Sequence, residues 1–125
     1  MSITLTQTIL VIEDTRSEME LMRHYLHDSG YNVVCATTAQ EGIAKAVSIK
    51  PFAIVTDVVM PGMSGFELCR HLKKNQETAS IPVVICSSKD QEIDRLWGMK
   101  QGADAYITKP FSKEQLIRAV KSVTL

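Results

Sequence analysis

The feature that most constrains the fold of this chain is the alternation of short apolar runs with longer segments of helical period. The runs are rich in isoleucine and valine, which is typical of strands buried on both faces of a parallel sheet. We expect strands at 9–12, 33–36, 52–56, 83–86 and 106–108, and helices at 17–29, 39–50, 65–75, 91–101 and 113–122. Five strand–helix units in a row predict an α/β fold with a doubly wound, five-stranded parallel sheet.

Capping residues support three of the predicted helix starts. In each case a hydroxyl residue precedes the helix and Glu or Gln follows three residues later, so the two residues can cap each other's backbone amides. The pairs are Thr38 with Glu41, Ser64 with Glu67, and Ser112 with Gln115. Gly30 and Gly102 stand where the first and fourth helices should end, because glycine adopts a left-handed backbone without steric cost.

The size and charge of the chain narrow its possible roles. A length of 125 residues suits one domain, over 1–125, with a single core and no output domain. The 14 Lys and Arg balance 14 Asp and Glu, so no overall charge attracts nucleic acid or an anionic membrane. No apolar run approaches a membrane-spanning length, and the start has no secretory leader. We therefore expect a soluble cytoplasmic protein without nucleic-acid binding or membrane insertion.

The cysteines and histidines indicate neither a disulfide framework nor a metal site. The three cysteines are an odd number without CxxC spacing, and we expect small buried side chains at Cys35, Cys69 and Cys86. The histidines fall among polar residues of predicted helices, so we expect solvent exposure at His24, His27 and His71.

Polar residues follow four of the five predicted strands. Ligands of an open α/β sheet bind outside the carboxyl ends of its strands, near the point where strand order reverses. The residues delivered there are Glu13 and Asp14 by the first strand, Asp57 by the third, Ser87 and Ser88 by the fourth, and Lys109 and Pro110 by the fifth. The second strand ends in Thr37 and Thr38, which suggests that it lies at the sheet edge, away from the site.

These residues suit phosphoryl transfer. The three carboxylates of Glu13, Asp14 and Asp57 would repel one another unless a cation lies among them, and an oxygen-only cluster implies Mg²⁺. Lys109 and Ser87 at the same rim could hold the oxygens of a transferring phosphoryl group. Asp57 is then the nucleophile, because it comes from a central strand and faces the others.

Each residue also has an ordinary alternative role when taken singly. The acids at 13 and 14 could belong to a solvated loop or a helix N-terminus, and Asp57 could start a turn. Lys109 could be a surface lysine, and Ser87 a turn residue bonded to backbone. These alternatives do not explain why all of them fall at the same edge of the sheet, and that joint placement favours a functional site.

Four segments, ILVIED, IVTDVVMPGMSGFEL, PVVICSS and GADAYITKPF, resemble the signature blocks of response-regulator receiver domains. The resemblance covers essentially the whole chain and implies the flavodoxin-like receiver fold with strand order 2-1-3-4-5. By this resemblance Asp57 is the phosphoacceptor, Asp14 a direct Mg²⁺ ligand and Glu13 a ligand acting through water. The backbone carbonyl of Val59 falls where the family supplies a third metal ligand.

The resemblance implies a switch as well. Ser87 resembles the hydroxyl that follows the phosphoryl group, and Lys109 the family's lysine, joined to Pro110 by a bond that the family holds cis. Tyr106 resembles the aromatic residue that turns inward on activation, although a half-buried sheet tyrosine is the ordinary alternative. The implied partners are a sensor histidine kinase and a downstream target protein, which binds a face formed by the fourth helix, fifth strand and fifth helix.

Two further positions bear on the lifetime of the phosphoryl group, and one segment bears on the signalling pathway. Val59 and Lys89 occupy the positions that tune phosphoryl lifetime in the family, and because an apolar Val59 cannot orient the attacking water, we expect a long-lived phosphoryl group. The segment SSKDQEIDRLWGMKQGAD resembles the fourth-helix region of single-domain regulators of type IV pilus motility and phototaxis. Its Trp97 could pack against the neighbouring strand or be an exposed anchor for a partner.

Three rival interpretations of the sequence are an enzyme, an inactive receiver and a fragment of a larger protein. An aspartate-nucleophile phosphohydrolase needs a second acid two residues after the nucleophile, but Arg16 and Val59 stand there, so we expect no enzyme beyond self-catalysed phosphotransfer and autodephosphorylation. The acidic residues, the hydroxyl residue and the lysine of the predicted site are all present, which argues against an inactive receiver. A receiver fragment of a larger DNA-binding transcriptional regulator remains the alternative.

Overall fold

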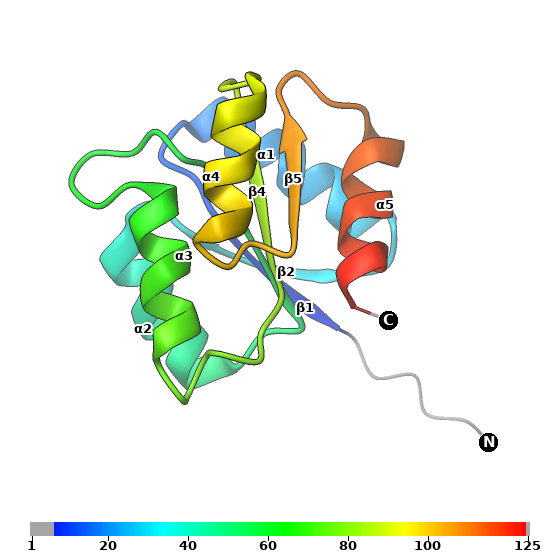
Figure 1. The fold of residues 1–125 in the computed structure, drawn as a ribbon. Helices are drawn as coiled ribbons and strands as arrows, with labels where there is room; N and C mark the ends of the chain where they lie inside the picture. Colours follow the sequence, from blue (N-terminus) through cyan, green and yellow to red (C-terminus); the bar gives the residue numbers. More distant parts are fainter. Residues whose placement is uncertain (1–6, 125) are drawn as a thin grey trace.

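The short apolar runs form the strands of one parallel sheet in the computed structural model, which describes residues 7–124. The strands are β1 (Thr8–Ile12), β2 (Asn32–Ala36), β3 (Ala53–Thr56), β4 (Val83–Ser87) and β5 (Ala105–Thr108). The helices are α1 (Arg16–Asp28), α2 (Ala39–Ile49), α3 (Gly65–Lys74), α4 (Glu92–Lys100) and α5 (Lys113–Val123). The order across the sheet is β2-β1-β3-β4-β5, which confirms the predicted fold (Figure 1).

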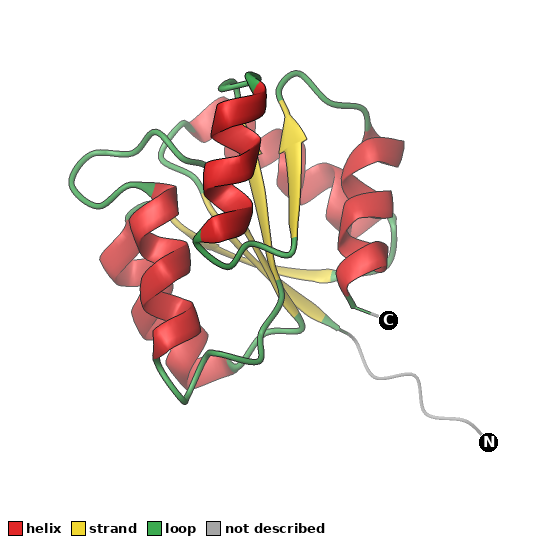
Figure 2. Cartoon of the chain, in the orientation of Figure 1, coloured by secondary structure: helices red, strands yellow, loops and turns green. Residues whose placement is uncertain are grey.

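The five strand–helix units cover the sheet on both faces, as Figure 2 shows. Successive residues of a strand point to opposite faces. Leu10 and Ile12 of β1 therefore pack in a core with α2 and α3, while Ile9 and Val11 pack in a second core with α1 and α5. This two-sided burial explains why the strands are apolar at almost every position.

The predicted boundaries differ from the observed ones by at most one residue at each end. β5 begins one residue earlier than expected, at Ala105, and β4 extends to Ser87, because both positions belong to the parallel ladder of these two strands. The expected strand at 52–56 begins at Ala53 instead. The ends of the expected domain, at 1–6 and 125, lie outside the described residues.

The reciprocal caps predicted for three helices are present at one of them. Ser112 and Gln115 of α5 cap each other's backbone amides, with distances of 3.1 and 2.8 Å. At α2, Thr38 accepts from the Glu41 amide at 3.1 Å, but the Glu41 carboxylate accepts from the Thr37 amide at 2.8 Å, one residue too early. At α3, Ser64 likewise accepts from the amide three residues on, with no return bond from that residue's carboxylate among the described contacts. The reciprocal prediction was therefore wrong for α2 and α3.

Two glycines end helices as predicted. Gly30 and Gly102 have φ angles of 96° and 106°, just beyond α1 and α4. Lys50 ends α2 in the same left-handed region with φ 52°, which the sequence did not predict because a lysine gives no such signal.

The isolated cysteines and histidines behave largely as expected. All three histidines are exposed, and Cys69 and Cys86 are buried. Cys35 is half-buried, since it lies on the edge strand β2. In the described part of the chain, no helix is long and apolar enough to cross a membrane.

Candidate functional site

The acids at the carboxyl ends of β1 and β3 meet as the sequence predicted. Glu13 and Asp14 follow β1, Asp57 follows β3, and these strands are neighbours in the sheet. Ligand atoms of all three carboxylates lie within 4.8 Å of one another. Glu13 and Asp57 are buried, whereas Asp14 is exposed, so the cluster opens to solvent on one side.

Backbone contacts fix Asp57 in place. Its amide donates to the Ile12 carbonyl at 3.1 Å, which continues the pairing of β3 with β1 beyond the strand. Its carboxylate oxygen Oδ1 accepts from the Val58 amide at 2.8 Å. The loop after β3 also folds back, because the Gly65 amide donates to the Val58 carbonyl at 2.8 Å. The Asp57 side chain is therefore oriented before any ligand arrives.

Gly65 allows this loop to approach Asp57 closely. A Cβ atom at Gly65 would lie 1.9 Å from the Asp57 carbonyl oxygen and 2.8 Å from the Val58 Cα, both backbone atoms that cannot swing aside. Any larger residue at 65 would therefore displace the loop that follows β3. The glycine that begins α3 is thus part of the support of the site.

Glu13 is completely buried and held at both oxygens. Oε2 accepts from the Thr15 amide at 3.2 Å, and Oε1 accepts from the Lys109 ammonium at 2.8 Å. A buried carboxylate is tolerable only with such partners. Glu13 therefore has a fixed position in the cluster.

Lys109 brings the opposite charge to the same point from β5. Its ammonium lies 2.8 Å from Glu13, 2.8 Å from Glu18 and 3.6 Å from Asp57, and its side chain is 12% exposed. Its amide donates to the Ser87 carbonyl at 2.9 Å, and the bond from Lys109 to Pro110 is cis, as the family resemblance implied. The ion pairs with Glu13 and Asp57 show that the lysine side chain points back over the strand ends.

The electrostatics of the cluster follow from burial and from this one ammonium group. Burial raises the pKa of the Asp57 and Glu13 carboxyls above their ordinary values, and the contacts with Lys109 only partly offset it. Burial alone would lower the pKa of Lys109, but the neighbouring carboxylates outweigh it and raise that pKa. The cluster therefore holds more negative than positive charge. Binding of a cation, or neutralisation of one carboxylate, would reduce this excess.

Ser87 and Tyr106 are joined through the backbone of Lys89. Ser87 is fully buried, and its hydroxyl accepts from the Lys89 amide at 3.1 Å. The Tyr106 hydroxyl donates to the Lys89 carbonyl at 2.7 Å, and the tyrosine is 6% exposed. Tyr106 also accepts at its carbonyl from Arg95 of α4, whose guanidinium lies 5.4 Å from the tyrosine ring centre. Tyr106 thus has the inward position in this structure.

Sequence reasoning missed Glu18. This residue lies in the first turn of α1, four positions after Asp14, and its carboxylate reaches Lys109. The contact lowers the pKa of Glu18. An acid in the first turn is an ordinary helix feature, so only its position after the strand that delivers Glu13 could have indicated a role.

Two other residues that the sequence singled out lie at the surface. Val59 is exposed to 59%, but a metal at its carbonyl remains a prediction. Trp97 is exposed to 48%, so it is not buried against the neighbouring strand.

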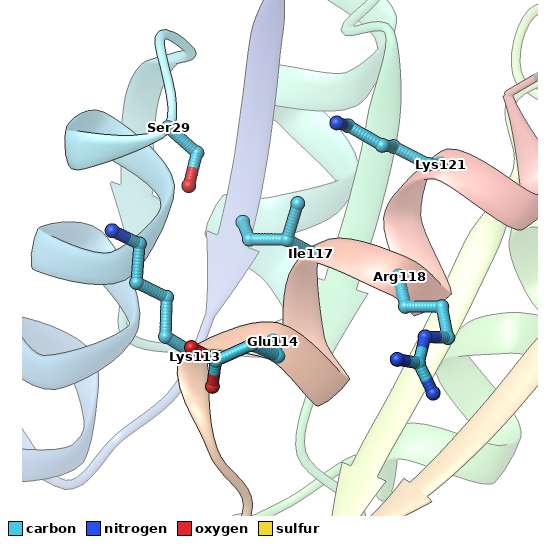
Figure 3. A pocket seen from close by; sticks show the side chains of 6 residues that line it. All are labelled: Ser29, Lys113, Glu114, Ile117, Arg118 and Lys121. Atoms are coloured by element: carbon cyan, nitrogen blue, oxygen red, sulfur yellow. The ribbon is translucent and has the colours of Figure 1, made fainter.

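Two of the surface cavities lie beside α1 or its C-terminal end. One, of about 360 Å³, opens beside Lys109 and is mainly apolar, with Leu21, Met22 and Phe111 in its wall. The other, of about 370 Å³, lies between the end of α1 and α5, with Lys113, Ile117 and Lys121 in its wall (Figure 3). The second contains none of the predicted site residues.

The sequence matches the family model described as response regulator receiver domain over residues 9–121. Protein PilH of Pseudomonas aeruginosa is 41% identical over 92% of this chain and 95% of its own length. The transcriptional regulatory protein PhoP of Bacillus subtilis is 37% identical over 95% of this chain, which spans about half of that protein (49%). The structure of the chemotaxis response regulator CheY4 of Vibrio cholerae is similar with a TM-score of 0.88, at 28% identity, over 95% of this chain and 99% of CheY4.

Proposed function

This chain belongs to the response regulator receiver domains, and from that membership we propose that it accepts a phosphoryl group on Asp57. The observation that carries the proposal is the meeting of three carboxylates within 4.8 Å with the ammonium of Lys109. Asp57 is available as nucleophile and metal ligand, the other two carboxylates as further metal ligands, and the lysine as a partner for phosphoryl oxygens.

In the proposed reaction, an Asp57 carboxylate oxygen attacks phosphorus in line with the leaving group. The new bond joins that oxygen to phosphorus, while the bond from phosphorus to the donor's imidazole nitrogen, or to the oxygen of an acyl phosphate, breaks and its electron pair leaves with the donor. Lys109 and the Ser87 hydroxyl donate to phosphoryl oxygens, which spreads the negative charge. A sensor histidine kinase is the proposed physiological donor.

The donor set fits a hard divalent cation, because the acidic cluster offers carboxylate oxygens only. We assign Mg²⁺ to Glu13, Asp14 and Asp57, together with the Val59 carbonyl. When bound, Mg²⁺ would neutralise charge on the carboxylates and on the phosphoryl oxygens. The exposed position of Asp14 leaves an open approach for the ion.

The contacts at Lys89 support a switch from Ser87 to Tyr106. A phosphoryl group that draws the Ser87 hydroxyl toward it would release the Lys89 amide, and the same residue's carbonyl holds the Tyr106 hydroxyl. Tyr106 lies under α4, so the change would reach the face formed by α4, β5 and α5. We assign the downstream target protein to this face.

Exposed apolar residues on α4 support the same assignment. Ile93, Leu96 and Trp97 are exposed to 65%, 58% and 48%, and their spacing places them on adjoining turns. Large apolar side chains gathered on a surface are typical of a protein interface. The apolar cavity beside Lys109 would in turn receive part of the phosphodonor protein.

We further propose that residues 1–125 act as one receiver domain, without an output domain, in type IV pilus motility. Support comes from PilH, which this chain matches over nearly all of PilH's length, whereas PhoP is matched over about half. The alternative is the receiver part of a DNA-binding regulator. The genomic reading frame after the codon of Leu125 distinguishes the two.

Incubation with acetyl phosphate and Mg²⁺, followed by intact mass measurement, tests the proposed phosphorylation. We expect one phosphoryl adduct on the wild-type protein and none on Asp57→Asn. An undiminished adduct on Asp57→Asn, or no adduct on a folded wild-type protein, would overturn the proposal. Self-hydrolysis of the adduct within seconds would contradict the long lifetime expected from Val59.

A further inference from the structure

We propose that Glu18 is a positioning residue for phosphoryl transfer, which holds the Lys109 ammonium before phosphorylation and releases it to the phosphoryl group. The inference rests on the proposed phosphoacceptor role of Asp57. It adds a residue from α1 to a site otherwise built from the strand ends.

Three carboxylates compete for the single ammonium of Lys109. Glu13 and Glu18 each lie 2.8 Å from Nζ, whereas Asp57 lies 3.6 Å away, beyond ordinary hydrogen-bond distance. The lysine is therefore paired with the two glutamates and stands back from the phosphoacceptor. To bind a phosphoryl oxygen on Asp57, it must give up part of this pairing.

Glu18 is the partner that can leave. Glu13 is fully buried and is held by the Thr15 amide as well, so it has no solvated position to move to. The Glu18 side chain is 39% exposed and lines the cavity beside Lys109. Its carboxylate can therefore turn into solvent at little cost, because an exposed acid regains its hydration there.

The charge of Glu18 opposes the incoming donor. With Glu13 and Asp57 it makes a third carboxylate around one ammonium, and Asp14 adds its charge to the same acidic cluster. A phosphodonor brings further negative charge to this point, and like charges at short range repel. Glu18 therefore slows phosphorylation in two ways, by retaining the lysine and by adding negative charge.

The test is the neutral, isosteric substitution Glu18→Gln, with Glu20→Gln as a matched control. Glu20 lies on the same helix, but its carboxylate pairs with Arg23 at the exposed surface. Both variants lose one negative charge. We expect Glu18→Gln to raise the rate of phosphorylation by acetyl phosphate about threefold, the size of one partly exposed ion pair. The control should leave that rate unchanged.

Three further measurements separate positioning from a structural role. The phosphoryl lifetime should change less than the phosphorylation rate, since Glu18 has already left Lys109 in the phosphorylated state. The ¹⁵N signal of the Lys109 side chain should move in unphosphorylated Glu18→Gln and stay in place in Glu20→Gln. Glu18→Asp, which keeps the charge but is one methylene shorter, should give an intermediate rate.

A rate for Glu18→Gln that equals or falls below wild type, with an unshifted Lys109 signal, would overturn this inference. Failure of the proposed function looks different, because then the wild-type protein itself would form no adduct on Asp57. Thermal unfolding of each variant checks that the proteins compared are folded.

Discussion

At the scale of single residues, burial changes the chemistry of Asp57. The folded protein raises the pKa of this carboxyl, mainly by desolvation, and Lys109 opposes the rise. A raised pKa means that the folded state holds the proton more tightly than the unfolded chain. The stabilising contribution of the Asp57 carboxyl is therefore fully present at a pH below its ordinary pKa of 3.8. It is lost as the pH rises through the pKa of the folded state. Ionised Asp57 destabilises the protein at neutral pH.

The substitution Asp57→Asn should therefore stabilise the protein at pH 7, by about 1 kcal/mol. The gain should shrink toward zero as the pH falls below 3.8, the ordinary pKa of the group, because wild-type Asp57 is then protonated in both the folded and the unfolded state. Urea unfolding of both proteins across this pH range, without divalent cations, measures the difference. A gain that is independent of pH would contradict the electrostatic cause.

The meeting of the acidic cluster with Lys109 could be predicted from the sequence, because the ends of the strands are easy to locate. Glu13, Asp14, Asp57 and Lys109 each follow an apolar run directly, so their meeting follows from the order of the strands. Glu18 was missed because its role depends on which way the first turn of α1 faces, and the sequence does not give that direction.

At the scale of elements, α4 is held differently from the other helices. Gly98 is its one buried residue, whereas helices such as α1 and α3 bury several large side chains. A Cβ at Gly98 would lie 2.9 Å from Cδ2 of Tyr106 and 3.2 Å from Cε1 of Phe66. The absence of a side chain at 98 thus lets α4 lie directly on the proposed switch residue.

We expect Gly98→Ala to displace the Tyr106 ring and to weaken its bond to the Lys89 carbonyl. The cost should be about 1 to 3 kcal/mol of unfolding free energy, as for other overpacked sites. Chemical denaturation measures the cost, and ring NMR signals of Tyr106 follow its position. In a Tyr106→Ala background the same substitution should cost much less. An equal cost in both backgrounds would show that the two residues do not act on each other.

The helices and strands could be predicted from the sequence, but some details at their ends could not. The five strands and five helices could be predicted from periodicity, since burial on both faces leaves a clear apolar pattern. The cap at Thr38 could be predicted only in part, because Glu41 had a choice between two neighbouring amides and pairs with Lys45 as well. The left-handed backbone of Lys50 could not be predicted, although the end of α2 was expected there, because a lysine gives no sign of a positive φ angle.

At the scale of the whole molecule, the proposed input and output lie on different elements. Asp57, the proposed acceptor, follows β3, whereas exposed apolar residues lie on α4. Between the two regions, hydrogen bonds join Ser87, Lys89 and Tyr106, and the Tyr106 carbonyl accepts from Arg95 of α4. A local change of charge at Asp57 could therefore alter a surface that another protein contacts.

Trp97, the single tryptophan of the chain, should report this change. It lies half-exposed on α4, next to the helix residue that contacts Tyr106. We expect its fluorescence to change when acetyl phosphate and Mg²⁺ are added, with no change in Asp57→Asn. An unchanged emission from a phosphorylated wild-type protein would argue against coupling between Asp57 and α4.

Locating the phosphoryl group on the chain tests most directly whether Asp57 is the phosphoacceptor. Borohydride reduces an aspartyl phosphate to homoserine, which peptide mass spectrometry can assign to one position of the chain. After reaction with acetyl phosphate and Mg²⁺, we expect homoserine at position 57 and at no other acid of the cluster. Homoserine at Asp14, or a phosphoryl group retained on Ser87, would contradict it.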